Sequence, residues 1–415
     1  MNTDSETFCA APWFHARHDN NQQWRCCALI DSDQTQGPAD RVMSWPQHSA
    51  LEYLNSEHVM YIRTQLDQGQ RIPECSACWR AESAGTVSLR QRINHLLTNG
   101  VWPDKSWINS YFSRKNNWQV DQVFSADIKF GNLCNFNCVM CHPIDSTQVF
   151  SHWQKNISNP VLQSRLAAKP LMFLQSRSIK QRSQSLEIIQ YMIDSGVRWL
   201  QILGGEPLIS QSLIHMLSQQ PQCVKDRIHL LFITNGSEDL ITTRQRLGDY
   251  KNITFTVSLE GVGAVQQYMR RGSDWKQCES NIDRYLQSHG HQCLHVAYTL
   301  QCLTVGRFHE LRRWADERGI MITVTPLVDP DFMSLQALPV PMYEPAYQSL
   351  GPISEIFKDV KFDARLLLSL RDWLKFWDPD DHWKSVFPEW QPYLSFPEKQ
   401  VPGQPTHIPL PRQQS

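Results

Sequence analysis

The sequence predicts an α/β protein whose main part is a partial (β/α)6 TIM-like barrel. Between residues 125 and 330, six short apolar runs that are typical of strands alternate with segments of helical periodicity. Strands that alternate with crossover helices form a parallel sheet, and functional loops follow the carboxyl ends of its strands. Six such units are enough for a partial barrel, but a closed barrel needs about eight. A small N-terminal unit and a helical, irregular C-terminal extension complete the predicted architecture.

The individual strands and helices follow from the spacing of the apolar residues. Helical stripes are predicted for the segment that ends at Gly196, for 279–286 and for 307–318. These helices are the crossovers between successive strands. The six predicted strands are 125–130, 198–203, 228–233, 252–258, 294–300 and 320–325.

Changes in composition divide the chain into four parts. Residues 1–100 form a first unit that is rich in cysteine, and residues 101–124 are polar and aperiodic, as expected of a linker. The barrel covers residues 125–330. Residues 331–415 are predicted to be an extension with proline-punctuated loops, an aromatic-rich helix over 366–377 and a tail rich in Pro and Gln, which is ordered only where it docks.

The charge balance indicates what the protein does not bind. Its 415 residues include 40 basic and 41 acidic side chains, a formal net charge of −1, without a charge run or a basic face. The sequence therefore predicts neither nucleic acid nor a membrane as a partner. The polar start lacks the features of a signal peptide, and no apolar run approaches the length of a membrane span. We expect a cytoplasmic protein.

In the cytoplasm, cysteines serve as thiols, metal ligands or catalysts rather than as disulfides. Eight of the twelve cysteines lie in tight groups along the sequence. The four scattered cysteines are most simply core or surface thiols. They are Cys223, Cys278, Cys293 and Cys302.

Three cysteines directly follow the first predicted barrel strand. Cys134, Cys138 and Cys141 have the spacing C-x3-C-x2-C in a short polar loop, so their sulfurs converge on one soft-metal object. A structural zinc ion takes four protein ligands, and a four-iron cluster usually takes four thiolates. The loop is one ligand short, which favours a four-iron cluster with one open iron. The alternative is a zinc site whose fourth ligand is His142 or comes from elsewhere.

The first hundred residues carry the other grouped cysteines. The turn Asn20-Asn21 predicts a hairpin, because Asn tolerates the left-handed backbone of such turns. The hairpin would bring Cys9 and either Cys26 or Cys27 to the same end of a two-stranded ribbon. A helix is predicted over 49–66, and a C-x2-C pair follows it. With that pair, Cys75 and Cys78, these cysteines could form a four-thiolate site for iron or zinc.

Polar residues and glycines follow the next predicted strand of the barrel. The second strand runs into Gly204-Gly205-Glu206-Pro207. Two glycines let the backbone approach a ligand closely, and the Glu206 carboxylate can pair with an ammonium group.

The third and fourth predicted strands also end in polar groups. Asn235 lies in a turn that could equally cap the next helix. Ser258 and Glu260 offer a hydroxyl and a carboxylate suited to ribose hydroxyls, and Arg270 could hold a carboxylate in bidentate fashion. A surface salt bridge is the simpler role for Arg270. Together these groups would face one mouth of the barrel.

These motifs resemble those of the radical S-adenosylmethionine (SAM) enzymes over residues 125–325. The three-cysteine spacing matches the cluster motif of that family, and Gly-Gly-Glu-Pro matches the segment that contacts the methionine amino group. Ser258 and Glu260 fall where the family has a ribose-binding Ser-x-Asp segment, so Glu260 is a departure. Met140 replaces the aromatic residue often found before the last cysteine.

The resemblance implies a cofactor set and a reaction. Cys134, Cys138 and Cys141 would hold a 4Fe–4S cluster whose open iron chelates SAM. A flavodoxin- or ferredoxin-type reductant would supply one electron, SAM would yield a 5′-deoxyadenosyl radical, and that radical would abstract hydrogen from a peptide or small biosynthetic substrate. The implied SAM-contacting residues are Phe136, Gly204, Gly205, Glu206, Pro207, Asn235, Ser258, Glu260 and Arg270.

The first hundred residues resemble a SPASM/twitch auxiliary cluster domain, placed before the barrel instead of after it. The resemblance implies a second, auxiliary 4Fe–4S cluster that works with the first in oxidation or crosslinking. Asn21 stands where the family usually has Gly. Cys27 leaves the choice of one ligand open, and Cys26 is preferred for its spacing. The implied ligands are Cys9, Cys26, Cys75 and Cys78.

Two other interpretations of the sequence stay open. One is non-oxidative radical chemistry on a small molecule, such as epimerisation, decarboxylation or transfer of a SAM-derived group. The other is a zinc-binding scaffold protein. The sequence identifies no catalytic acid or base, and position alone suggests His142, Lys129, Tyr298 and Asp329.

Overall fold

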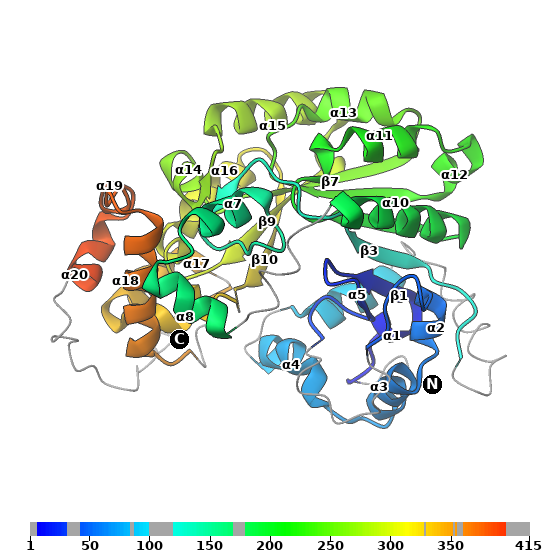
Figure 1. Cartoon of the computed structure of the whole chain (residues 1–415), viewed down its shortest axis with the longest axis horizontal. Helices are drawn as coiled ribbons and strands as arrows, with labels where there is room; N and C mark the ends of the chain where they lie inside the picture. Colours follow the sequence, from blue (N-terminus) through cyan, green and yellow to red (C-terminus); the bar gives the residue numbers. More distant parts are fainter. Residues whose placement is uncertain are drawn as a thin grey trace, which may run out of the picture.

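The computed structural model shows one large sheet with helices around it (Figure 1). The predicted linker up to residue 118 and the Pro- and Gln-rich tail from residue 396 lie outside the described residues. The structure describes residues 6–30, 42–83, 87–98, 119–168, 179–327, 329–351, 353–354 and 360–395.

The sheet has eight strands in the order β10-β9-β7-β6-β5-β3-β1-β2. Neighbouring strands are parallel except for β1 and β2. All six strands predicted for the barrel are present, so the α/β prediction is confirmed. In the described part of the chain the sheet is open, with β10 and β2 at its edges, which is compatible with a partial barrel. The strands are β1 His15–His18, β2 Trp24–Arg25, β3 Ser125–Lys129, β5 Trp199–Leu203, β6 His229–Thr234, β7 Asn252–Ser258, β9 Leu294–Leu300 and β10 Met321–Pro326.

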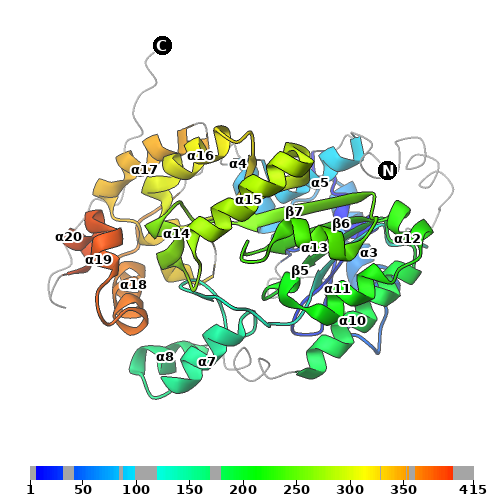
Figure 2. The same ribbon diagram turned by 90° about the horizontal axis from the view of Figure 1, so that it is seen from above.

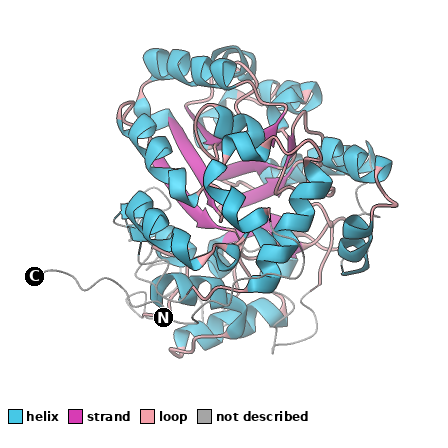
Figure 3. Cartoon of the chain, turned by 90° about the vertical axis from the view of Figure 1, so that its left-hand side faces the viewer, coloured by secondary structure: helices cyan, strands magenta, loops and turns pink. Residues whose placement is uncertain are grey.

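Helices connect the parallel strands, as the alternating pattern predicts. Figures 1 and 2 show α10, α11, α13 and α15 along one side of the sheet, and Figure 3 shows the strands enclosed by helices. No helix among the described residues is long and apolar enough to cross a membrane. The N-terminal helices are α1 Ala11–Phe14, α2 Ala50–Leu54, α3 Glu57–Asp67, α4 Ser76–Ser83 and α5 Leu89–Thr98. Those of the barrel and the extension are α7 Thr147–Lys155, α8 Pro160–Ala168, α10 Ile179–Asp194, α11 Gln211–Ser218, α12 Gln222–Arg227, α13 Leu240–Leu247, α14 Ala264–Met269, α15 Trp275–His289, α16 Phe308–Asp316, α17 Tyr343–Leu350, α18 Ala364–Trp377, α19 Trp383–Val386 and α20 Gln391–Leu394.

The two faces of the sheet differ in polarity, because successive side chains of a strand point to opposite faces. On β9, the alternating residues Leu294, Val296, Tyr298 and Leu300 are buried, whereas the intervening His295, Ala297 and Thr299 are half-buried. Full burial of a large apolar side chain contributes about 1.5–3 kcal/mol. The buried face therefore forms the main core, and the opposite face mixes polar side chains such as Thr254 with apolar ones such as Leu231.

The hairpin predicted at Asn20-Asn21 is confirmed, and it joins the barrel sheet. β1 pairs antiparallel with β2 and parallel with β3. Side chains strengthen the second pairing, since His15 hydrogen-bonds Ser125 at 2.8 Å. The sequence did not predict that the first unit adds strands to the sheet of the barrel.

The prediction of a single helix over 49–66 is wrong, because the structure has two helices there. Ser56 begins α3, and its hydroxyl accepts a hydrogen bond from the Val59 N–H at 3.3 Å. Asn55 leaves the helical path and donates to the Val120 carbonyl at 2.8 Å. A capping serine therefore restarts the helix, although the apolar stripe continues across the break.

Candidate metal and cofactor centre

Three cysteines gather in the loop after β3. Cys134 and Cys138 are buried and Cys141 is half-buried. Burial raises the pKa of Cys138 to about 12, and the Cys134 thiol adds to the effect while Arg270 opposes it. Burial and the two other thiols also raise the pKa of Cys141. Thiols that lie this close and are this costly to ionise become thiolates when a metal cation balances their charge, so they suit a metal centre.

The end of β5 packs backbone to backbone against this loop. The Gly205 N–H donates to the Gly131 carbonyl at 3.2 Å, and the Glu206 N–H donates to the Leu133 carbonyl at 2.7 Å. A Cβ atom on Gly204 would lie 2.7 Å from the Gly131 oxygen, and one on Gly205 would lie 2.3 Å from the Leu133 oxygen. The two glycines are thus required by the cysteine loop itself, because a side chain there would push it away.

The Glu206 carboxylate is buried and engaged by its own chain. It accepts hydrogen bonds from the Leu208 N–H at 3.0 Å, the Thr234 hydroxyl at 2.9 Å and the Asn235 N–H at 2.5 Å. Burial raises the pKa of Glu206 to about 7, although these hydrogen bonds act to lower it. Pro207 is also buried. The carboxylate joins the ends of β5 and β6, so pairing with an ammonium group would require it to give up donors.

The turn after β6 also contacts the cysteine loop. Asn235 donates to the Asn135 side-chain oxygen at 2.8 Å, and Asn135 donates to the Ser237 hydroxyl at 3.0 Å. Phe136 is buried inside the loop, and its N–H donates to the Cys134 sulfur at 3.4 Å. The polar turn therefore fixes the loop in addition to preceding the next helix.

Glu260 and Arg270, which the sequence suggested as separate ligand contacts, bind each other. Arg270 donates to Glu260 at 2.7 Å, and the Thr299 N–H donates to the other carboxylate oxygen at 3.3 Å. Burial opposes the charge of Arg270, but Glu260 and then Cys138 outweigh it and raise the pKa of the guanidinium. Arg270 thus places a permanent positive charge beside the cysteine loop. Ser258 is half-buried at the end of β7.

A short strand pair and helix α18 hold the loop from the other side; sequence reasoning missed the strand pair and predicted the helix without its contact to the loop. β4, Asn137–Cys138, pairs antiparallel with β8, Arg270–Arg271. The Trp373 indole N–H donates to the Val139 carbonyl at 3.2 Å. Trp377 stacks on His152 with ring centroids 4.7 Å apart. Two-residue strands have no periodicity to detect, whereas the aromatic spacing of the predicted helix 366–377 was a visible signal.

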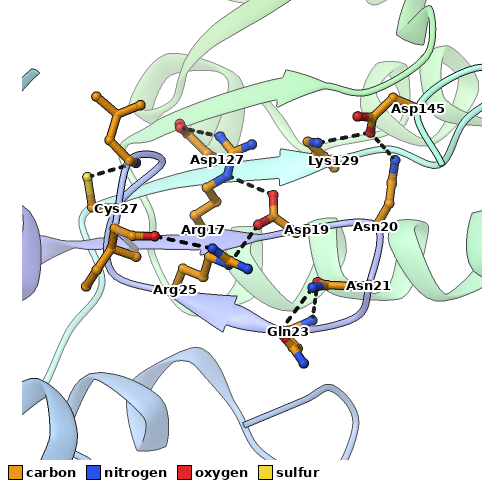
Figure 4. A network of polar contacts seen from close by, with 12 residues as sticks. Arg17, Asp19, Asn20, Asn21, Gln23, Arg25, Cys27, Asp127, Lys129 and Asp145 are labelled. Atoms are coloured by element: carbon orange, nitrogen blue, oxygen red, sulfur yellow. Dashed lines mark hydrogen bonds and ion pairs between the residues drawn. The ribbon is translucent and has the colours of Figure 1, made fainter. Parts of the chain in front are cut away.

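Asn20 is a second contact that the sequence did not reveal, since it served there only as a turn residue. Its amide donates to the Gly131 carbonyl at 3.2 Å and to Asp145 at 2.9 Å, and Lys129 also donates to Asp145 at 2.9 Å. Figure 4 shows this side-chain cluster between the hairpin and the segment after the cysteine loop. The hairpin therefore helps to position that loop.

Ion pairs neutralise the charges where the hairpin meets β3 (Figure 4). Arg17 pairs with Asp19 at 2.8 Å and with Asp127 at 3.5 Å. Arg25 pairs with the second oxygen of Asp19 at 3.1 Å. Each of these positive groups thus contacts a negative one where the hairpin and β3 lie side by side.

The residues that position alone suggested as acids or bases all contact other side chains. Lys129 pairs with Asp145, as described above. His142 lies 3.1 Å from Asp329, and the Tyr298 hydroxyl lies 2.9 Å from that of Thr304. Both Tyr298 and Thr304 are buried. These contacts suit structural roles and do not single out a catalytic acid.

The structure also brings the five N-terminal cysteines together. Cys9 precedes α1, and Cys26 and Cys27 follow β2. Cys75 directly precedes α4, and Cys78 lies in the first turn of that helix. Burial raises the pKa of Cys9 to about 12, and Cys78 and Cys26 add to it. Burial, then Cys9, Cys27, Cys26 and Cys78, raise the pKa of Cys75. The segments that carry these thiols are far apart in the sequence, and the fold places them within electrostatic range of one another.

Helices α4 and α5 fix the backbone around these cysteines. The Ala10 N–H donates to Asn94 at 2.9 Å, and Asn94 donates back to the Phe8 carbonyl at 2.7 Å. The Trp79 indole N–H donates to the Ile72 carbonyl at 2.9 Å. The segments on both sides of the cysteine group are therefore held by side chains from elsewhere in the first unit.

The donor chemistry of both groups fits iron–sulfur clusters. Among the described residues, no three His, Cys, Asp or Glu side chains are arranged around a single point as the ligands of one metal ion are. A cubane cluster binds each thiolate through a different iron, so its cysteine ligands need not meet at one point. The loop after β3 would hold such a cluster through three cysteines, and the N-terminal group offers enough thiols for four ligands.

Comparison with curated proteins finds relatives among the GTP 3′,8-cyclases. Those of Brucella canis and Brucella suis are each 26% identical to this chain over 160 residues, which is 38% of the chain and 46% of the relative. The chain thus spans less than half the length of the curated relatives it matches. No family model matches the sequence. The match agrees with the radical SAM resemblance that the motifs carry.

Solved structures show more distant likenesses. One is anSMEcpe with bound AdoMet and the Cp18Cys peptide, with a TM-score of 0.36, 14% identity and coverage of 55% of this chain and 58% of that chain. Another is SuiB from Streptococcus suis bound to the precursor peptide SuiA, with a TM-score of 0.35, 14% identity and coverage of 64% and 51%. Similarities this low carry no argument about the site.

Proposed function

We propose that this protein is a radical SAM enzyme that acts on a peptide or a small biosynthetic substrate. Cys134, Cys138 and Cys141 would hold a 4Fe–4S cluster and leave one iron for SAM. When bound, this pair of cofactors supplies a 5′-deoxyadenosyl radical for hydrogen abstraction, after one electron arrives from a flavodoxin- or ferredoxin-type reductant. The cofactors carry the difficult chemistry, and the protein orients them and excludes water.

The packing of the cysteine loop against the strand ends carries this proposal. Gly204 and Gly205 meet the loop without space for a side chain, and Asn235 bonds to it from the next strand. The loop therefore lies at the carboxyl edge of a parallel sheet, where α/β proteins bind ligands. A surface zinc knuckle would not need two neighbouring strand ends to be shaped around it.

The contacts proposed for SAM depend on which polar groups of the site are already hydrogen-bonded within the chain. Because the Glu206 carboxylate is occupied by three donors, we propose that Gly-Gly-Glu-Pro meets the methionine part of SAM through its backbone. Ser258 and Glu260 are proposed for the ribose, with Arg270 holding Glu260 in place. Phe136 and Asn235 complete the proposed contacts from the loop and from the end of β6.

The polar face of the sheet suggests how the substrate is recognised. From β5 to β10, the alternating residues of this face include no Asp, Glu, Lys or Arg. They include Gln201, Thr254 and His229, whose ring accepts or donates a 2.8 Å hydrogen bond with the Thr254 hydroxyl. Burial lowers the pKa of His229 to about 4, so this imidazole is neutral at pH 7. The charged residues Arg17, Asp127 and Lys129 lie on the same face at β1 and β3, where they are paired with one another and with Asp145. An uncharged polar substrate, such as a peptide segment, suits the part of the face from β5 to β10.

We further propose that the N-terminal thiols hold an auxiliary 4Fe–4S cluster, which favours oxidation or crosslinking as the outcome. Residues 1–100 would be the auxiliary unit, 101–124 the linker, 125–330 the catalytic barrel and 331–415 an extension that supports the cysteine loop. A cytoplasmic location is proposed as well, since reducing conditions keep twelve cysteines available as thiols.

Anaerobic purification tests the proposal. We expect a brown protein with about eight irons per chain that converts SAM to 5′-deoxyadenosine when dithionite is added. Replacing Cys134, Cys138 and Cys141 by Ala should abolish SAM cleavage and leave about four irons. A colourless protein with stoichiometric zinc would contradict the proposal and favour a zinc-binding scaffold.

A further inference from the structure

The two edges of the sheet differ in how well the chain protects them. β2 has only two residues, one of them charged, and the Trp24 N–H donates to the Met43 carbonyl of a covering segment at 2.9 Å. β10 has six residues, all of them exposed or half-buried, and none carries a charge. Proteins blunt edge strands by short length, charge, proline or a covering segment. In the part of the chain that the structure describes, β10 has only Pro326, at its very end.

The backbone of β10 directs alternate residues toward β9 and away from it. The Leu327 N–H donates to the Leu300 carbonyl at 2.9 Å, so Leu327 faces β9. Every second residue before it also faces β9, and the residues between them face outward. These outward residues are Ile322, Val324 and Pro326. Among the described residues, the peptide groups of Ile322 and Val324 have no hydrogen-bond partner, so they form an open edge.

We propose that an extended segment of the peptide substrate pairs with this open edge as an additional strand of the sheet. The inference rests on the proposed function, since it takes this sheet to be the catalytic one, and it narrows the substrate to a peptide. An extended peptide carries donors and acceptors at the spacing of the open edge. Its backbone is uncharged, which complements a strand without charged side chains beside a polar face that has none from β5 to β10.

The open edge also leads toward the cysteine loop. β10 ends at the carboxyl edge of the sheet, and three residues later Asp329 lies 3.1 Å from His142, the residue after the third cysteine of the loop. Three residues of extended chain cross about 10 Å, so a peptide that pairs with β10 and continues past it would reach the loop. One set of its alternating side chains would lie beside Thr323 and Thr325, which are in register with the polar face of β9.

Hydrogen–deuterium exchange at single residues of the full chain tests this pairing with two synthetic peptides. The first is a blocked octapeptide of alternating threonine and valine, N-methylated along one edge so that it cannot build larger sheets. The control has the same sequence and is N-methylated along both edges, so it cannot pair. We expect the first peptide at saturation to slow exchange of the Ile322 and Val324 amides by about tenfold or more, and the control to leave both unchanged.

Val324→Pro and Thr325→Pro form a matched pair of variants. The N–H that is lost points outward in the first variant and toward β9 in the second. We expect Val324→Pro to keep its circular dichroism spectrum and to lose the protection of Ile322 by the first peptide, whereas Thr325→Pro should lower the thermal midpoint. Because the two peptides are compared on the wild type, a Val324→Pro protein that does not fold leaves their result decisive.

Three results would overturn the inference. One is unchanged exchange with the first peptide, and another is equal protection by both peptides. The third is a dimer in sedimentation that Val324→Pro dissociates, because a second copy of the chain would then occupy the open edge.

Iron content and SAM cleavage with dithionite are measured on the same wild-type preparation. Slowed exchange in a protein without an iron cluster would contradict the proposed enzyme and keep the peptide-binding edge. An active enzyme with unchanged exchange would keep the enzyme and overturn the edge. The two failures are therefore distinguishable.

Discussion

The two cysteine groups of this protein are assembled in opposite ways. In the loop after β3, three cysteines lie within a few residues of each other, and strand ends and helix α18 close around them. The N-terminal group draws its thiols from three segments, near Cys9, after β2 and at α4. A ligand set within one loop costs little chain entropy to form, whereas one assembled from distant segments depends on the surrounding fold. The comparison teaches that the first site is local and supported from outside, and that the second is a product of tertiary structure.

The largest expected effect concerns the charge beside the loop site. Arg270→Met would leave Glu260 buried without its cation, and we expect a loss of about 4 kcal/mol in the free energy of unfolding. Denaturant unfolding of the variant measures it. Iron should leave the loop before it leaves the N-terminal group. Two further variants serve as controls. Adding Glu260→Gln should recover part of the loss, and Arg365→Met, at a side chain that is 89% exposed, should leave the midpoint unchanged. A fully stable Arg270→Met protein would contradict the importance of this pair.

The next effect is pH dependence at the loop site. Glu206 has a pKa of about 7 in the folded protein, above the 4.5 of an ordinary Glu, so the native state binds its proton more tightly than the unfolded state does. The protonated Glu206 therefore contributes about 3 kcal/mol to the free energy of unfolding below pH 4.5. This contribution is lost as the pH rises to about 7. Between pH 5 and pH 8, the free energy of unfolding should fall less steeply with rising pH for Glu206→Gln than for the wild type. Equal slopes would contradict the prediction.

A smaller effect is expected where β5 meets the loop. The Cβ of Gly205→Ala would lie 2.3 Å from the Leu133 oxygen, and we expect a loss of about 2 kcal/mol together with loss of iron from the loop site. The matched control is Gly306→Ala, because no atom lies within 4 Å of the Cβ there. Iron content and thermal midpoints check both variants. An unchanged loop site in Gly205→Ala would mean that the backbone contact is not required.

The smallest effect separates the two sites most directly. Trp373→Phe and Trp79→Phe each remove one indole N–H bond to a backbone carbonyl near a cysteine group, and each should cost about 1 kcal/mol. The first should make iron in the loop site more labile to a chelator, and the second should do so only in the N-terminal site. The rate of iron loss to a chelator measures this effect, in variants in which only one of the two cysteine groups is intact. If either variant weakened both sites equally, the two groups would not be independent.

Sequence reasoning succeeded where the interactions are close in the chain. It located the six barrel strands, the hairpin at Asn20-Asn21 and the three-cysteine loop, because period-two alternation, turn chemistry and ligand spacing are local signals. It predicted one unbroken helix over 49–66, because the apolar stripe continues past Ser56. The helical backbone itself is interrupted there. It also treated Glu260 and Arg270 as two separate contacts, since nothing in their spacing shows that a buried ion pair joins them.

The sequence by itself determined the α/β class, the order of the strands along the chain and the soft-metal character of the grouped cysteines. Only the tertiary structure decided that Gly205 serves the cysteine loop, that the Glu206 carboxylate is occupied and that the N-terminal hairpin extends the sheet of the barrel. The physical reason is that residue type fixes which bonds a side chain can make, whereas packing decides which partner comes within reach of it.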